Sequence, residues 1–253
     1  MGTKPGVDIW LPANWPAPPW VYAGITTRQG GISEAPFDSL NLALHVGDHA
    51  DSVTQNRRLV SEALNLPSEP IWLNQIHGNH IIKGTMTDGP ATADGSYTNQ
   101  RRIVCTVMTA DCIPLLLCHR SGTEIAAIHV GWRGLCAGII PAAIDTFHGD
   151  VVDLLAWMGP HISATYYEVG DEVRNACTAV DEDTETGFTR NHHGRWQANL
   201  EEITRIILIN NGLTSIYSAG RCTFSENHCF FSYRREKRTG RMASFIWMDK
   251  TDN

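Results

Sequence analysis

Four apolar runs crowd the middle of the chain and constrain its architecture most. They are Ile103 to Met108, Ile113 to Cys118, Glu124 to Val130 and Val151 to Trp157. Short apolar runs with β-branched residues between turn signals are typical of strands buried on both faces. Pro114 argues against one continuous central strand across the first two runs, because proline has no N–H to donate to a ladder. The runs therefore predict several buried strands in the centre of the fold.

Further elements flank this centre. Val21 to Thr26 reads as another strand. Helical spacing of apolar residues predicts four helices, Asp51 to Leu64, Leu135 to Phe147, Val169 to Ala179 and Ala198 to Asn211. Asp51 or Ser52 is expected to cap the first helix, and Pro141 is expected to kink or delay the second. Strands and helices that alternate in this way indicate an α/β protein, and 253 residues are enough for one large domain or two small ones.

Charge and cysteine usage narrow the class of function. The net charge of -7 argues against a nucleic-acid coat and against an anionic membrane surface. Seven scattered cysteines and a polar beginning without an apolar signal core favour a reduced, cytoplasmic protein. No apolar run reaches the length of a membrane helix. We expect a small-molecule substrate, with no nucleic acid and no membrane partner.

Three residues far apart in the sequence form a candidate metal site. His77 lies in Asn-Gln-Ile-His-Gly, Cys112 in Thr-Ala-Asp-Cys-Ile-Pro and His129 in Ile-His-Val-Gly-Trp-Arg-Gly. Two imidazoles and a thiolate hold zinc while leaving a fourth position open, which is typical of a catalytic site. Spacing alone does not establish that the three converge. The alternative is a buried thiol with two core or rim histidines.

The segment after His129 is a candidate anion site. Gly131 to Gly134 follows a strand and precedes a helix, an order that places backbone N–H groups at one spot. Arg133 adds a fixed charge. The pattern is weaker than a P-loop, and a tight turn explains it equally well.

The C-terminal segment is a second dense patch. Arg234 and Arg235 lie beside the aromatic run from Phe230 to Tyr233, an arrangement suited to clamp an anionic or planar substrate. For Lys237 and Arg238 a solvated basic turn is at least as good an interpretation.

Several of these motifs, taken in order, resemble one family. NQIHG, TADC-IP, HVGWRG, MGP and FFSYRRE followed by TGRMASFIW are similar to the bacterial YfiH-like proteins of the multicopper polyphenol oxidase (laccase-domain) family. The resemblance extends from Thr26 to Trp247. It implies a single YfiH-like domain over residues 1–253, an α/β fold of mixed sheets flanked by helices, and similarity to bacterial toxin deamidases. It also implies a Zn²⁺ site of His77, Cys112 and His129, which would then be the catalytic residues.

The resemblance further implies an activity. Family members are expected to cleave adenosine, inosine and 5'-methylthioadenosine with phosphate, and to deaminate adenosine to inosine. Phosphorolysis would yield the free base and a (methylthio)ribose 1-phosphate. Substrate and phosphate contacts are then expected from Arg28, Asn41, Arg133 and Arg234, with Asn41 chosen through the resemblance alone. The protein would be a monomer or a homodimer.

Two alternatives stay open. A laccase-like polyphenol oxidase requires copper, for which histidine pairs of the H-x-H type are usual, and the chain contains none. Without a metal, Cys112 and His129 would make a thiol nucleophile and its base, as in an amidase acting on a cell-wall precursor. A proton-transfer residue is not evident, because neither His77 nor His129 is followed by the H-x-E glutamate of zinc deaminases.

Overall fold

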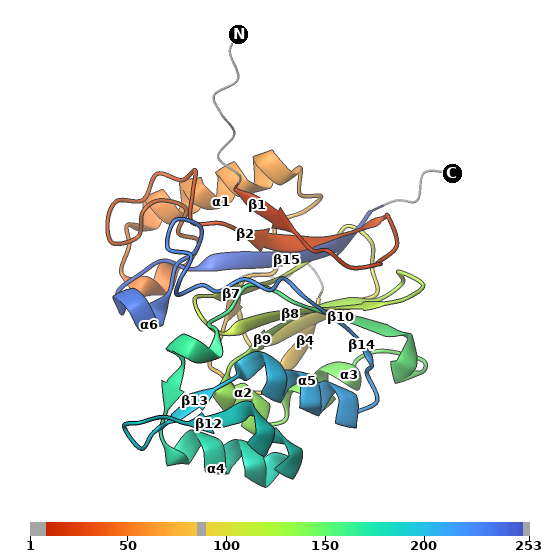
Figure 1. Ribbon diagram of the computed structural model, residues 1–253. Coiled ribbons are helices and arrows are strands. Elements are labelled where there is room, and N and C mark those ends of the chain that lie inside the picture. Colours follow the sequence, from red (N-terminus) through yellow and green to blue (C-terminus); the bar gives the residue numbers. More distant parts are fainter. Residues whose placement is uncertain (1–8, 85–89, 250–253) are drawn as a thin grey trace.

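Two large β-sheets packed face to face form the centre of the molecule, and helices cover their outer faces (Figure 1). The computed structural model describes residues 9–84 and 90–249. The smaller of the two sheets is antiparallel throughout. Its strands run in the order β1 (Trp10–Pro12), β2 (Val21–Thr26), β15 (Met242–Met248) and β7 (Val104–Thr109).

The larger sheet is mixed. Its strands run in the order β14 (Ser215–Ser218), β10 (Leu154–Met158), β8 (Ile113–His119), β9 (Ile125–Val130), β6 (Gly95–Thr98) and β4 (Ile81–Lys83). The inner strands pair antiparallel, whereas the two edge strands pair parallel to their neighbours. Two small sheets complete the set, β3 (Leu73–Asn74) with β5 (Ala91–Thr92), and β11 (Glu168–Val169), β13 (Trp196–Ala198) and β12 (Phe188–Arg190).

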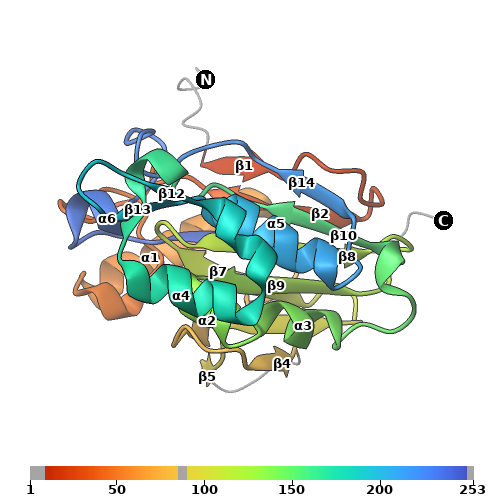
Figure 2. The ribbon, with the colours of Figure 1, turned by 60° about the horizontal axis from the view of Figure 1, so that its bottom comes forward.

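The helices divide between the two outer faces (Figures 1 and 2). Helix α1 (Ala50–Leu64) covers the four-stranded sheet. On the other side lie α2 (Trp132–Cys136), α3 (Ile139–Ile144), α4 (Asp171–Val180) and α5 (Leu200–Asn210). The short α6 (Tyr233–Glu236) precedes β15. Short 3-10 helices occupy Leu44–Val46, Val151–Asp153, Ala164–Tyr166 and Glu182–Gly187.

Alternation along the strands divides the apolar residues among three cores. On β15, Phe245 and Trp247 face α1, whereas Ile246 and Met248 face the larger sheet. This is the two-residue period of a strand buried on both sides. The fold is thus a mixed α/β fold of several sheets flanked by helices, as the sequence predicts.

Two of the local predictions are wrong. Leu135 to Phe147 is not one helix, because Gly138 adopts a left-handed φ of 84° and divides it into α2 and α3. Pro141 then lies in the first turn of α3, where its missing N–H costs nothing. Neither Asp51 nor Ser52 caps α1, since the N-cap residue is His49, without a side-chain cap. The break after Met108 is confirmed, with Pro114 near the start of β8.

Within residues 9–84 and 90–249, no helix combines the length and the apolar character needed to cross a bilayer.

Candidate metal centre

His77, Cys112 and His129 converge. One donor atom of each residue lies within 4.8 Å of the donors of the other two. The imidazole rings of His77 and His129 meet edge to face, with 4.7 Å between their centroids. His129 is buried, Cys112 is partly exposed and His77 is exposed, so the cluster opens to solvent on the His77 side.

The register of two strands brings Cys112 to His129. In the antiparallel β8–β9 pair, Ile113 lies opposite Val130 and Pro114 opposite His129, so Cys112 falls opposite Gly131. A Cβ on Gly131 would lie 3.0 Å from the Cys112 sulfur and 3.3 Å from the His77 ring. Glycine at this position therefore leaves room for the side chains that make the cluster.

Asp94 holds His77 and His129 in place relative to each other. It directly precedes β6, and its carbonyl oxygen accepts the His129 backbone N–H at 2.7 Å. Its carboxylate accepts the Nδ1–H of His129 at 2.9 Å and the backbone N–H of His77 at 2.8 Å. The N–H groups of Ile76 and Gly78 complete the set at 3.2 and 2.6 Å. One carboxylate thus holds the turn in which His77 adopts a left-handed φ of 62°.

This contact also fixes which nitrogen of His129 is available to a metal ion. Because an ionised carboxylate only accepts hydrogen bonds, Nδ1 carries the proton and Nε2 keeps its lone pair for the cluster. Burial on its own would raise the pKa of Asp94, but hydrogen bonds from His129, Gly78 and His77 lower it. A carboxylate behind a ligating histidine is the usual partner in zinc sites.

The charges around Cys112 favour the deprotonated form of its thiol. Burial would raise the pKa of Cys112, but His129 and then His77 lower it to about 6. Burial would lower the pKa of His129, yet Cys112 and Asp94 raise it to about 9. Without a metal the pair is therefore a thiolate beside an imidazolium at neutral pH. A divalent cation would replace the imidazolium proton, since the ligating imidazole must be neutral.

The three donors fit a tetrahedral zinc ion. Zn–N bonds of about 2.0–2.1 Å and a Zn–S bond of about 2.3 Å place tetrahedral donors roughly 3.3–3.7 Å apart. The observed separations are all within 4.8 Å, so side-chain adjustment around an ion would bring the donors to this spacing. The set supplies three ligands and leaves the fourth position to solvent or substrate.

Asp111 anchors the Cys112 segment rather than facing the donors. Its φ is 98°, in the left-handed region that few non-glycine residues adopt. One carboxylate oxygen accepts the Thr223 hydroxyl and the other the backbone N–H of Arg234, both at 2.6 Å. The carbonyl oxygen accepts the Ile162 N–H at 3.0 Å. The C-terminal segment is thereby attached beside Cys112.

The structure places the four expected substrate contacts in different settings. Arg234 is attached beside Cys112 through its backbone N–H bond to Asp111, and its guanidinium donates to the Glu168 carbonyl at 2.7 Å. Arg28 is buried, bonded to the Asp38 and Asn227 carbonyls and to the Glu236 carboxylate. Asn41 is fully buried, bonded to Ala43, Asp48 and the Arg241 N–H. Arg133 is exposed and lies over the Trp132 ring at 4.3 Å.

Three residues near the cluster escaped the sequence analysis. Asp94 is the first, and a signal was available, because Thr92-Ala93-Asp94 repeats the triplet that precedes Cys112. Arg241 is the second: burial lowers the pKa of its guanidinium, and the nearby Cys112 and Asp111 oppose that shift. Tyr167 is the third, with its pKa raised first by burial and then by the Cys112 charge, so its hydroxyl stays protonated.

With this geometry in place, comparison with known proteins gives the family. The family model described as "Multi-copper polyphenol oxidoreductase laccase" matches residues 22–249. The chain belongs to this family, as its motifs predict.

Individual relatives agree over most of their length. The chain is 48% identical to "Purine nucleoside phosphorylase YfiH" of Shigella flexneri over 238 residues, which cover 93% of this chain and 97% of the relative. It is 33% identical to "Purine nucleoside phosphorylase YlmD" of Bacillus subtilis, over 90% of this chain and 88% of the relative.

Solved structures share the fold. Neisseria meningitidis protein NMB0706 superimposes with a TM-score of 0.91 at 41% identity, covering 96% of this chain and all of that one. YlmD from Geobacillus stearothermophilus superimposes with a TM-score of 0.90 at 31% identity, covering 98% of each chain.

Proposed function

We propose that this protein is a zinc-dependent purine nucleoside phosphorylase whose metal ligands are His77, Cys112 and His129. One observation carries the proposal: the three donors converge on an open site in a chain 48% identical to a protein named as a purine nucleoside phosphorylase. The proposed substrates are adenosine, inosine and 5'-methylthioadenosine. Zinc at this site would supply a Lewis acid next to the departing base or to an activated water.

The reaction needs a held phosphate and a stabilised sugar cation. Arg241 and Arg234 supply positive charge on the Cys112 side of the cluster, where Asp111 anchors the segment. An anionic nucleophile is favoured where fixed guanidinium groups already lie in a partly buried setting. Arg28, Asn41 and Arg133 remain proposed contacts, and the first two also hold the surrounding backbone in place.

Adenosine deamination is the second proposed reaction, and it has less support. It requires a group that moves protons at the metal. Two carboxylates contact the segments that carry the donors, and both are occupied, Asp94 by four N–H groups and Asp111 by Thr223 and Arg234. The protonated hydroxyl of Tyr167 is then the candidate donor.

The experiment that tests the proposal separates the products. Protein of defined zinc content is incubated with each nucleoside, with and without phosphate, and the products are resolved by chromatography. Free base and ribose 1-phosphate that require phosphate support phosphorolysis, whereas inosine from adenosine without phosphate supports deamination. Parallel samples loaded with copper and given a phenol test the oxidase alternative.

Cys112→Ser separates the metal enzyme from the thiol enzyme. Loss of zinc together with activity is expected if Cys112 is a ligand. Loss of activity with full zinc content, or amide hydrolysis that survives chelation, would instead identify Cys112 as a nucleophile with His129 as its base.

A further inference from the structure

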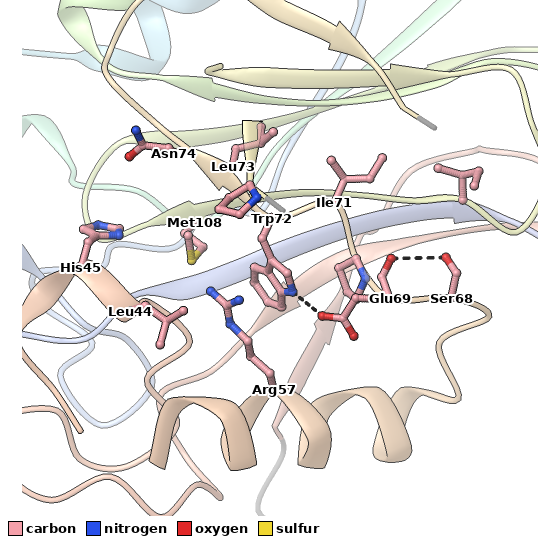
Figure 3. A pocket seen from close by; sticks show the side chains of 13 residues that line it. Leu44, His45, Arg57, Ser68, Glu69, Ile71, Trp72, Leu73, Asn74 and Met108 are labelled. Carbon is pink, nitrogen blue, oxygen red and sulfur yellow. Dashed lines mark hydrogen bonds between the residues drawn. The ribbon is translucent and has the colours of Figure 1, made fainter. Parts of the chain in front are cut away.

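A cavity of about 620 Å³ lies between α1 and the segment that leads to His77. Its volume falls within the range of small-molecule sites. The three donors of the metal centre do not line it. Its walls combine apolar side chains with a few polar groups, among them Ile71, Trp72, Ile103 and Met108, with Arg57 and His45 (Figure 3).

Arg57 is the unusual member of this wall. Its guanidinium lies flat on the Trp72 indole, 3.6 Å from the ring centroid, and its Nε donates to the Leu42 carbonyl at 2.9 Å. No carboxylate of the described residues makes an ion pair with it. The nearby Glu69 instead accepts the Trp72 Nε1–H at 2.6 Å. Glu69 is close enough to stabilise the Arg57 charge electrostatically, but burial outweighs this effect, and a partly buried cation without a direct ion pair costs free energy that a bound anion would recover.

The positive charges of Arg57 and Arg241 both act on the His45 end of the cavity. In Figure 3 the terminal nitrogens of Arg57 point toward the side lined by Leu44, His45 and Met108, away from Glu69. Burial, then Arg241 and Arg57, lower the pKa of His45, which is therefore neutral at pH 7 and able to donate or accept one hydrogen bond. Burial also lowers the pKa of Arg57, to about 10, so its charge persists at neutral pH.

We propose that this cavity, the Arg57 pocket, binds a small anion that carries one phosphate or carboxylate on an aromatic body. The anionic group is held by the terminal nitrogens of Arg57 and by His45. The aromatic body packs against Ile71, Ile103 and Met108. This site is additional to the metal centre and does not depend on the activity proposed above.

The pocket and the metal centre share two segments. Asn74 lines the pocket, Gln75 follows it, and His77 is two residues further along. Met108 lines the pocket and precedes Cys112 by four residues. The Gln75 amide joins the two segments, donating to the Met108 carbonyl and accepting the Met108 N–H, both at 2.8 Å. An occupant of the pocket therefore contacts the backbone that carries two of the three ligands.

Calorimetric titration of the zinc-loaded protein tests the proposal. The anionic probes are phenyl phosphate and indole-3-acetate, which distinguish phosphate from carboxylate, and the partial probes are indole and acetate, none of which is a substrate or product of the proposed phosphorolysis. At least one anionic probe is expected to bind about tenfold or more tightly than either partial probe, because only it has both the charge and the aromatic body.

Substitutions test whether the probes bind in the Arg57 pocket. Arg57→Leu is expected to weaken binding about tenfold or more, as is His45→Glu, a substitution at an exposed position that adds a carboxylate beside Arg57. Arg58→Leu is the matched control, because this neighbour is exposed and paired with Glu62. Thermal unfolding identifies a variant that fails to fold, in which case His45→Glu decides. Two results would overturn the proposal. One is that neither anionic probe binds. The other is that Arg57→Leu and His45→Glu leave binding intact while Cys112→Ser abolishes it.

Discussion

Asp94 and His129 are joined twice, since the Asp94 carbonyl oxygen accepts the His129 backbone N–H and the Asp94 carboxylate accepts its Nδ1–H. The first bond belongs to the β6–β9 ladder, in which Gly95 lies opposite Ile128. The second orients the His129 ring in the candidate metal centre. The sheet register and the geometry of the site are therefore set by the same residue.

Asp94→Asn should weaken metal binding about 10–100-fold, the usual effect of removing the partner behind a ligating histidine. The amide still accepts hydrogen bonds from the 76–78 turn, but it no longer stabilises the Nδ1–H tautomer with a full charge. Competition with a chromogenic chelator measures the affinity. Asp38→Asn, at a carboxylate with more than half of its side chain exposed, is the control. Equal affinities for Asp94→Asn and wild type would refute the role.

Gly131→Ala should reduce zinc content and activity together. The φ of Gly131 is -101°, which alanine adopts without strain, so the effect comes from the new methyl group against Cys112 and His77. Gly78→Ala is the control, because its Cβ would make an ordinary contact of 3.5 Å with Asp94. The measurement is metal analysis of the purified variants. A Gly131→Ala protein with full zinc would show that the ligands have room to move.

Asp111→Ala should destabilise the protein by on the order of 2–4 kcal/mol, because the buried Thr223 hydroxyl and the Arg234 N–H both lose their acceptor. Asp111→Asn should lose less, since asparagine tolerates the left-handed φ and keeps an acceptor oxygen. Urea unfolding of both variants gives the two free energies. Similar losses for alanine and asparagine would contradict the anchoring role.

The contribution of Glu124 to the free energy of unfolding should depend on pH. Burial would raise its pKa, but the His148 amide, the Tyr97 hydroxyl and the His148 ring lower it. A carboxyl whose pKa is lowered on folding stabilises the protein above its ordinary value of 4.5, and this is lost as the pH falls through the lowered value. The stability difference between wild type and Glu124→Gln should therefore be full at pH 7 and shrink below about pH 4.5. Urea titrations from pH 3 to 7 measure it, and a constant difference would contradict the mechanism.

Cys112 should be alkylated more readily than Cys105 or Cys118 in the metal-free protein near neutral pH. Its pKa is lowered to about 6, whereas burial raises the pKa of Cys105 and of Cys118 to about 12. Iodoacetamide labelling read by mass spectrometry should rise through about pH 6 and be suppressed by zinc, because the thiolate is the nucleophile. Labelling of Cys112 that begins only above pH 8 would show that His129 does not stabilise the thiolate.

Sequence patterns predict the parts of this molecule that depend on local chemistry. Composition alone predicts the strand at Val21–Thr26. It also predicts β7 and β8, the two strands before and after Asp111. The break of the helix at Gly138 does not, since a glycine within an apolar helical pattern is compatible with either outcome until tertiary packing selects its φ.

The three proposed ligands can be predicted from local motifs, whereas the contacts of Asp94 depend on long-range strand pairing. His77, Cys112 and His129 are identifiable because each has an unusual motif, although only the β8–β9 register shows that Cys112 reaches His129. In the sequence, the repeated Thr-Ala-Asp triplet is the signal that marks Asp94, and it does not show which residues Asp94 contacts. Its importance arises from the β6–β9 register and from the turn at residues 76–78, both of which are long-range features.

The position of Asp94 also links metal binding to the folding of the chain. The four residues of the centre come from segments up to 52 residues apart, and they meet only after β6, β8 and β9 have paired in register. An unfolded chain therefore offers scattered donors, while the native chain offers a complete set. Zinc bound at the proposed site would shift the folding equilibrium toward the native state by mass action, so the midpoint of unfolding is expected to rise with free zinc concentration.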